Sequence, residues 1–367
     1  MVGIITVGSC GIYICEFLIM TNKQFFIRTI AYSLGLLVMI AAITVIIDPF
    51  VHYHAPFFGL AAAETEERGQ QIGVAKNMSY DTAIIGSSMS ENFEAGWFDD
   101  GIIGNSTVKL SMQGAHFDDY SRLLNVVLSK PETKTVIISL DNYILLHNPS
   151  EHPTTIPDYL ENDTVKDDIY YLWNKSVAFV YLPQFIINNI TEGFSADSAY
   201  CWAGRYKFDR YVAQATYLPY RLMQPEPEEK FDTYYGYSEE FLAGITPYIE
   251  ARPDVQFIFY APPYSIMYWD DCILRGRLTA EICALNEVYK RLLGYDNVRI
   301  FYFQDNWDII TDLNNYKDYS HFSQDISHYL YECMATGNNE ITSETSFDTL
   351  LKFSEDVAAY DHELTFH

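Results

Sequence analysis

The chain has 367 residues, of which 49% are apolar and 20% are charged, and its formal net charge is −26. This composition provides enough apolar side chains for one sizeable core and excludes a disordered chain. The strong acidity argues against nucleic-acid binding, because nucleic-acid phosphates are recognised by Lys and Arg side chains.

A membrane anchor is the first predicted element. Residues 29 to 47 carry no charge, and nineteen residues at about 1.5 Å each roughly cross a bilayer core of about 30 Å as a helix. Lys23 and Arg28 precede this run, which places that side in the cytoplasm and the chain after Asp48 outside. A cleaved signal peptide is the alternative, but the A-x-A-like site at residues 61 to 63 lies far beyond the apolar run.

Residues 1 to 20 allow two interpretations. They are apolar, but the stretch is short, contains Gly and is interrupted by Glu16. They form either a first membrane span or an artefact of start-site choice, since Met20 begins a natural-looking start. In both cases residues 1 to 50 hold one or two apolar anchor segments in a cytoplasmic membrane, and residues 51 to 367 form an extracytoplasmic domain.

The outer domain alternates between strand-like and helix-like patterns. Short apolar runs that end at Gly or Pro predict strands, and apolar residues at helical spacing predict helices. This alternation predicts a parallel sheet covered on both faces, in which ligands bind beyond the carboxyl ends of the strands. The predicted strands are residues 81–86, 106–112, 135–140, 255–260 and 298–303, and the predicted helices are residues 89–98, 117–129, 279–293, 323–333 and 346–360.

Residues 145 to 250 break this alternation. They are rich in Tyr, Asn, Asp and Pro, with helical pieces around residues 168–190 and 208–223. We interpret them as an insertion on the binding side of the sheet. A separate second domain is the alternative, although no linker marks its boundary.

A serine-rich turn is the first candidate for chemistry. The sequence from Gly86 to Ser90 falls where the first predicted strand meets the following helix. A serine such as Ser88 at that turn projects its hydroxyl from the sheet edge, beside backbone N–H groups that face the same space. Acyl transfer needs both a nucleophile and donors for the oxyanion that forms on attack. The alternative is an ordinary loop in which a serine caps a helix.

The second candidate is an Asp-x-x-His pattern, Asp318 to His321, which follows the last predicted strand. A base for Ser88 must titrate near neutrality, which indicates His, and a carboxylate three residues earlier can orient it. Alone, the pattern is more often a capping feature or a surface pair. On a parallel sheet, however, Ser88 after the first strand and His321 after the last lie on the same carboxyl edge, so they can meet.

The order of these motifs resembles that of the SGNH (GDSL-like) hydrolases. It is most similar to their membrane-anchored branch, which handles cell-surface polymers and includes alginate-acetylation and DltD-like teichoic-acid D-alanylation proteins. The resemblance spans roughly residues 48 to 335 and implies a flavodoxin-like three-layer α/β/α sandwich with about five parallel strands. Its sharpest points are residues 84–93, 110–114, 259–264 and 318–321.

The resemblance implies a role for several residues. The family's nucleophile falls on Ser88, its acidic partner on Asp318 and its base on His321. The family's second-block glycine, a donor to the oxyanion, falls on Gly114. The N–H groups of Ser88 and Gly114 are therefore the expected backbone donors of an oxyanion hole.

Two positions depart from the family pattern. The usual Asp of the first block is Ser87 here, and the third block, usually Gly-x-Asn-Asp, reads Ser139-Leu140-Asp141-Asn142. This alignment puts Asp141 where an amide donor is expected, and an ionised Asp cannot donate to an oxyanion. Either Asn142 supplies the third donor, or the hole has only its two backbone donors.

The function implied by the resemblance is an extracytoplasmic Ser-His-Asp esterase or O-acyltransferase, with acetyl as the expected acyl group. The expected substrate is a cell-surface or exported polysaccharide, and a membrane-bound O-acyltransferase is the suggested partner. No metal or organic cofactor is needed. Water as the second acceptor gives an esterase and a sugar hydroxyl gives a transferase, and the sequence does not choose between them.

Two alternative functions stay open. The irregular third block favours a catalytically inactive protein that kept the fold as a glycan-binding or scaffold component of a polymer-modification complex. A lipase would need an apolar lid, whereas the Tyr- and Asp-rich insertion is better suited to sugars. Trp202, Trp269 and Tyr268, with residues 260–264, are aromatic candidates for stacking on sugar rings, although core packing is the default for most of them.

Metal and disulfide chemistry receive little support. His52 and His54 have a metal-ligand spacing but no further ligands nearby, so an interfacial or surface role is expected. None of the six cysteines forms a CxxC pair. Cys272 and Cys283 are close enough in sequence to pair, but free, mostly buried thiols are the simpler interpretation, which extends to Cys201 and Cys333.

Overall fold

The computed structural model describes residues 21–146, 156–162, 164–191 and 195–366. The question of a first span in residues 1 to 20 lies outside this described part of the chain. The domain is built on one sheet with the order β2-β1-β3-β4-β5-β6. Its strands are β1 (Thr82–Gly86), β2 (Thr107–Ser111), β3 (Thr135–Ser139), β4 (Gln256–Ala261), β5 (Val298–Tyr302) and β6 (Glu340–Ile341).

The sheet confirms the predicted α/β class. Strands β1 to β5 are parallel, and all five coincide with predicted strands. Strand β6 pairs antiparallel with β5 and was not predicted, because two residues carry no periodic signal. Every residue of β1 and β3 is buried, as expected for parallel strands covered on both faces. The order of the parallel strands, β2-β1-β3-β4-β5, is that of doubly wound α/β sheets.

A row of helices packs side by side along the sheet. In this row α3 contacts α4, α4 contacts α10, α10 contacts α12 and α12 contacts α15. Helix α4 shows why: its buried Tyr120, Leu123, Leu124 and Val127 recur at helical spacing and form one apolar face. The row consists of α3 (Glu67–Asn77), α4 (Phe117–Ser129), α10 (Phe231–Ala251), α12 (Leu278–Leu292) and α15 (Ser346–Ala359).

Two predicted boundaries were wrong. The helix expected at residues 89 to 98 is a series of turns followed by a 3₁₀ helix, η1 (Ala95–Phe98), because Ser90 bonds the Ser87 carbonyl and the Ser111 hydroxyl. Helix α10 lies between β3 and β4 in the chain and packs against α4 and α12, so its residues are not part of the insertion predicted to run to residue 250.

The shorter elements complete the domain. They include α14 (Gln324–Thr336), which contacts η1, and α11 (Ile266–Leu274), which contacts α12. The others are α5 (Asn142–Leu146), α6 (Asp158–Glu161), α7 (Ile169–Leu172), η3 (Val177–Tyr181), α8 (Leu182–Ile190), η4 (Ala196–Ser198), η5 (Ala203–Arg205), α9 (Arg210–Tyr217), η6 (Leu218–Tyr220), α13 (Trp307–Ile310), η7 (Leu313–Asn315) and η8 (His362–Phe366).

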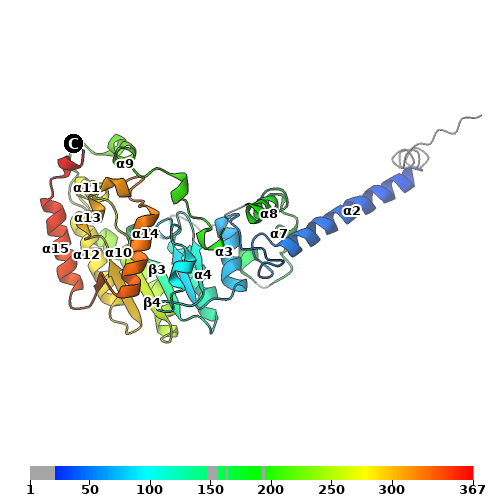
Figure 1. Ribbon diagram of the computed structural model, residues 1–367, viewed down its shortest axis with the longest axis horizontal. Coiled ribbons are helices and arrows are strands. Elements are labelled where there is room, and N and C mark those ends of the chain that lie inside the picture. The colour runs from blue at the N-terminus through cyan, green and yellow to red at the C-terminus, as the bar shows by residue number, and fades with distance from the viewer. Residues whose placement is uncertain (1–20, 147–155, 163, 192–194, 367) are drawn as a thin grey trace, which may run out of the picture.

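Helix α2 (Asn22–Ile47) extends away from the α/β domain, with α7 and α8 near the end where it joins the domain (Figure 1). It is long and apolar enough to cross a membrane. Its C-cap, Asp48, adopts a left-handed backbone and accepts hydrogen bonds from the N–H groups of Tyr53 and His54. The Tyr171 hydroxyl also donates to Asp48, at 2.8 Å, so the end of α2 is fixed to α7.

Candidate active site

The carboxyl ends of three adjacent strands bring the candidate residues together. Gly86 at the end of β1 pairs with Ser111 of β2, and Ile85 pairs with Ile138 of β3, so the strands end level. The segments that follow them carry Ser88, Gly114 and Asp141. These three residues, with His321 from the loop before α14, line one cavity of about 600 Å³.

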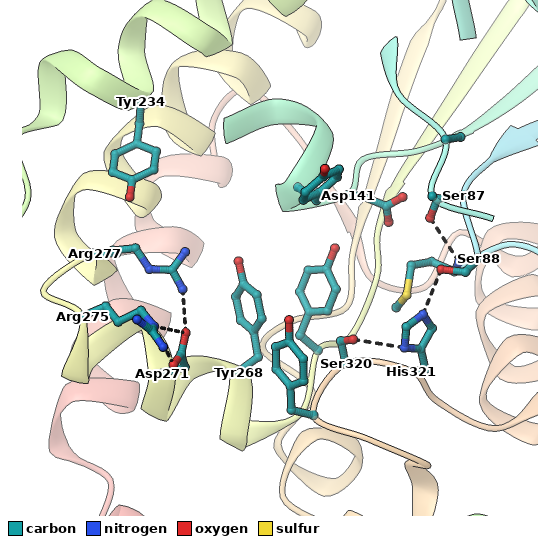
Figure 2. A pocket seen from close by; sticks show the side chains of 16 residues that line it. Ser87, Ser88, Asp141, Tyr234, Tyr268, Asp271, Arg275, Arg277, Ser320 and His321 are labelled. Carbon is teal, nitrogen blue, oxygen red and sulfur yellow. Dashed lines mark hydrogen bonds and ion pairs between the residues drawn. The ribbon is translucent and has the colours of Figure 1, made fainter. Parts of the chain in front are cut away.

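Ser88, His321 and Asp318 form a continuous chain of hydrogen bonds. The Ser88 hydroxyl oxygen lies 2.8 Å from Nε2 of His321, although the residues are 233 positions apart in sequence. On the other side of the ring, Nδ1 lies 2.8 Å from Oδ2 of Asp318. The ring thus stands between a hydroxyl and a carboxylate, the arrangement that lets an imidazole accept a serine proton. Figure 2 shows the Ser88 side of this chain.

The loop before α14 holds Asp318 in its charged form. Burial alone would raise the pKa of this carboxyl, but the hydrogen bond from the His321 ring and those from the backbone N–H groups of His321 and Ser320 hold it well below its usual range. The ammonium of Lys317 adds a further positive charge 3.3 Å from Oδ2. Asp318 is therefore a permanent negative charge that can stabilise a protonated His321.

Trp202 from the insertion supports the triad from a second side. Its indole N–H donates to the Ser88 carbonyl at 3.2 Å, and its ring packs edge-on against the His321 ring, with centroids 5.5 Å apart. The Lys317 ammonium lies over the same indole. We had considered Trp202 for sugar stacking, and no sequence pattern connects it with Ser88, 114 residues away.

The turn that carries Ser88 depends on a glycine. A Cβ on Gly86 would collide with the Ser90 side chain, which fills the space beneath the turn. Ser90 in turn bonds the Ser87 carbonyl at 2.9 Å and the Ser111 hydroxyl at 2.7 Å. The small residue at position 86 thus allows the chain to fold back tightly and present the Ser88 hydroxyl at the sheet edge.

Two residues that line this cavity have backbone N–H groups without a hydrogen-bond partner among the described residues. No hydrogen bond within the described residues uses the N–H of Ser88 or of Gly114. Gly114 has a φ of +59°, a left-handed conformation that glycine adopts without strain. Its position is fixed from outside, because Arg68 donates to the carbonyls of Gln113 and Gly114. Both groups are free to donate to an oxygen bound beside Ser88.

Asp141, and not Asn142, lines the cavity, as the strict alignment of the third block implies. Asn142 does not line the cavity: its side chain is buried, its amide nitrogen lies 3.3 Å from the Tyr268 hydroxyl, and Gln304 donates to its oxygen. The expectation that Asn142 supplies an oxyanion donor is therefore corrected, because its amide already has partners in the core.

Asp141 lines the cavity instead, on the side of Ser87 (Figure 2). Its Oδ1 accepts a hydrogen bond from the Ser139 hydroxyl at 2.8 Å, while Oδ2 is buried without a partner among the described residues. Burial raises the pKa of this carboxyl above its ordinary value, against the effect of nearby hydroxyl groups. A neutral Asp141 can donate a hydrogen bond, which an ionised one cannot.

The other end of the cavity is lined by aromatic and charged side chains. The rings of Tyr264 and Tyr268 stack with centroids 4.5 Å apart, and Tyr319 continues the stack. Beyond them, Asp271 accepts hydrogen bonds from Arg275 at 2.9 Å and from Arg277 at 3.0 Å. Figure 2 shows Tyr268 between the Ser88 end and this arginine end of the cavity.

The other histidine, aromatic and cysteine candidates of the sequence do not form a metal site, a sugar-stacking surface or a disulfide in the described part of the chain. His52 pairs with Asp168, and His54 lies 2.7 Å from the Val45 carbonyl. No group of three or more His, Cys, Asp or Glu side chains suited to a metal occurs among the described residues. Trp269 and Tyr260 are fully buried in the core. The thiols of Cys201, Cys272, Cys283 and Cys333 are free.

Comparison with known proteins adds no identification. No protein family and no curated protein sequence matches the chain. The functional argument therefore depends on the geometry of the cavity.

Proposed function

We propose that this chain is a membrane-anchored serine esterase or O-acyltransferase of the SGNH type, which acts outside the cytoplasmic membrane on an O-acylated polysaccharide. The observation that carries this proposal is the hydrogen-bonded chain from Ser88 through His321 to Asp318 at the carboxyl edge of a parallel sheet. A packing feature would not require a hydroxyl and a carboxylate on opposite nitrogens of one imidazole, next to two unused N–H groups.

The proposed reaction begins with attack by the Ser88 hydroxyl oxygen on the acyl carbonyl carbon. Nε2 of His321 takes the serine proton as the new C–O bond forms. When the tetrahedral intermediate collapses, the bond from the acyl carbon to the leaving sugar oxygen breaks, and His321 returns the proton to that oxygen. Water or a second hydroxyl then attacks the acyl-serine by the same route, which restores Ser88 and releases acid or a new ester.

The oxyanion is held by three donors in this proposal. The N–H groups of Ser88 and Gly114 supply two of them. Asp141, which lines the same cavity and whose pKa is raised by burial, supplies the third in its neutral form. Apolar burial keeps carboxyl groups neutral in other oxyanion holes, where they donate to developing negative charge.

The substrate proposal follows from the rest of the cavity. The stacked rings of Tyr264, Tyr268 and Tyr319 line one part of the cavity, and Asp271 and Arg275 line the part beyond them. Sugars bind through this combination of ring stacking and directed polar contacts. Together with the anchor helix α2, this favours an envelope polysaccharide with an acetyl group, and a membrane-bound O-acyltransferase as the partner that handles the acyl donor.

The test uses the full chain in detergent micelles with a fluorophosphonate probe and 4-nitrophenyl acetate. We expect wild type to label and to turn over, and Ser88→Ala and His321→Ala to fall to background. Ser129→Ala and His328→Ala, at surface positions, are the matched controls. Equal labelling of wild type and Ser88→Ala would show that the nucleophile is assigned wrongly. If wild type neither labels nor releases acetate from O-acetylated polysaccharide, the scaffold alternative is correct.

A further inference from the structure

The insertion carries a helix that is apolar on two opposite faces. The helical turns of η3 and α8 run without a break from Val177 to Ile190. Val177 and Phe185 are buried against the domain. η3 is a π-helical turn that continues into α8. Phe179 and Val180 of η3, with Ile187 and Ile190 of α8, are exposed and so lie away from the buried side. The first and last of these are 71% and 74% exposed, so a continuous apolar face is left open.

The neighbouring helix α7 ties this face to the anchor helix. The indole N–H of Trp173, at the end of α7, donates to the Leu37 carbonyl of α2 at 3.0 Å. Helix α2 also contacts η3, and the Asp48–Tyr171 hydrogen bond fixes the junction. Leu37 lies ten residues before the end of α2, which is about 15 Å along the helix axis. The insertion therefore lies alongside the anchor helix rather than beyond its end.

The length of α2 left free by this contact is too short for a bilayer. From Arg28, the last charged residue before the apolar run, to Leu37 the helix rises only about 14 Å. The hydrocarbon core is about 30 Å thick. If the whole domain stayed outside the membrane, roughly half of the core would have no helix to cross it. Helix α2 can cross the whole hydrocarbon core only if α7, η3 and α8 lie inside the membrane beside it.

The charge of this region differs from that of the rest of the molecule. The chain has a net charge of −26. Among residues 164 to 191, however, no carboxylate is in the exposed class, and the exposed charges are those of Lys166 and Lys175. A carboxylate-free apolar face with flanking ammonium groups suits acyl chains and anionic headgroups. Apolar Ile169 and Trp173 are also exposed on α7.

We propose that the open face of α7, η3 and α8 is embedded in the acyl chains of the outer leaflet, next to α2. This inference rests on the proposed role of α2 as a membrane anchor. The consequence is that the catalytic domain is held against the membrane surface at a fixed height and orientation rather than on a free tether.

Lipid-chain quenching of tryptophan fluorescence tests the proposal. The full chain is reconstituted into phosphatidylethanolamine–phosphatidylglycerol vesicles with or without brominated acyl chains. Of the five tryptophans, only Trp173 lies on the proposed face. We expect brominated lipid to quench wild type, Trp173→Phe to lose this quenching and Trp97→Phe to keep it. Phe179→Trp should add quenching, whereas Tyr211→Trp, exposed on α9 far from α2 (Figure 1), should add none.

Trp173→Phe removes the hydrogen bond to Leu37 and can disturb the junction with α2. The Phe179→Trp variant keeps this bond and tests the same face independently. Fluorescence of Phe179→Trp that brominated lipid leaves unchanged would overturn the proposal and indicate that solvent or a protein covers the face. A chain that fails to float with the vesicles would overturn it through loss of the anchor. Fluorophosphonate labelling of the same vesicles reports Ser88 separately, so a failed triad and a failed membrane face give different results.

Discussion

Two loops at the same sheet edge each place a carboxyl group near Ser88, and they favour opposite protonation states. The loop before α14 gives Asp318 an imidazole, two backbone N–H groups and a nearby ammonium. The loop after β3 buries Asp141 among neutral hydroxyl groups, and its Oδ1 accepts a hydrogen bond from Ser139. The pKa of Asp318 is lowered and that of Asp141 is raised.

This contrast assigns the two groups to different roles. A carboxyl that stays charged can orient His321 and stabilise its positive form. A carboxyl that stays neutral can donate to negative charge that develops on the substrate. The lowered pKa therefore assigns Asp318 to stabilise the base. The raised pKa assigns Asp141 to donate to the oxyanion. Replacing each carboxyl group by an amide should therefore affect activity to different extents.

The largest effect is expected from Asp318→Asn. The amide keeps the shape but favours the wrong tautomer of His321 and removes the balancing charge, so kcat with 4-nitrophenyl acetate should fall by roughly 10³–10⁴-fold. The matched change Asp141→Asn should keep most of the activity, because an amide also donates. A comparable loss in both variants would contradict the assignment of roles.

A smaller loss is expected from Asp141→Ala. Removing one oxyanion donor costs about 10²–10³-fold in kcat, with KM little changed, because the donor acts in the transition state. Asp141→Asn should recover this loss. Steady-state kinetics of the two variants check the prediction, and an alanine variant as active as wild type would show that two backbone donors suffice.

The pH dependence of stability should have opposite signs for the two carboxyl groups. The raised pKa of folded Asp141 means that the folded chain holds a proton that the unfolded chain releases above about pH 4. Its contribution to stability is therefore full at low pH and is lost as pH rises, by up to about 1.4 kcal/mol per pH unit. Asp318, with its lowered pKa, contributes stability above about pH 4 that is lost as pH falls.

Denaturant unfolding of the two asparagine variants from pH 2 to pH 9 measures these signs. Asp141→Asn should gain stability over wild type as pH rises, and Asp318→Asn should regain stability relative to wild type as pH falls. If the free energy of unfolding relative to wild type changed with pH in the same direction for both variants, the opposite signs assigned to Asp141 and Asp318 would be contradicted.

The sequence predicted the side of the site that depends on strand order. Level parallel strands place the residues after their carboxyl ends together, so Ser88 could be placed from short apolar runs. Gly114 was placed through the family resemblance. Helix α4 was predicted to the residue, because one clear apolar face fixes both its ends. The same order of parallel strands predicted that His321 lies close to Ser88.

The rest of the site depends on contacts that leave no local pattern. Which of two adjacent residues faces the cavity was decided by α5, which begins at Asn142 and turns its amide toward Tyr268 and Gln304. The contact of Trp202 with His321 spans more than one hundred residues. Helix α10 was assigned to the insertion because its Tyr-rich sequence, with Pro247 inside, has a weak apolar face.

The smallest loss of kcat is expected from Gly114→Ala. This variant changes a backbone donor to the oxyanion and leaves both carboxyl groups in place. A Cβ at Gly114 meets no atom within 4 Å, so the cost is the strain of a left-handed φ of +59°, about 1–2 kcal/mol. Gly101, with a φ of +75° and equally open space, is the matched control.

Both alanine variants should lose similar stability in denaturant unfolding, but only Gly114→Ala should also lower kcat, because relaxation of its backbone moves an oxyanion donor. The fold-loss of activity should be the same at every pH, since a peptide N–H does not titrate. Wild type and Gly114→Ala should therefore share the decline in kcat that follows ionisation of Asp141 as pH rises. A decline that is present in wild type and disappears in Gly114→Ala would contradict its assignment to Asp141.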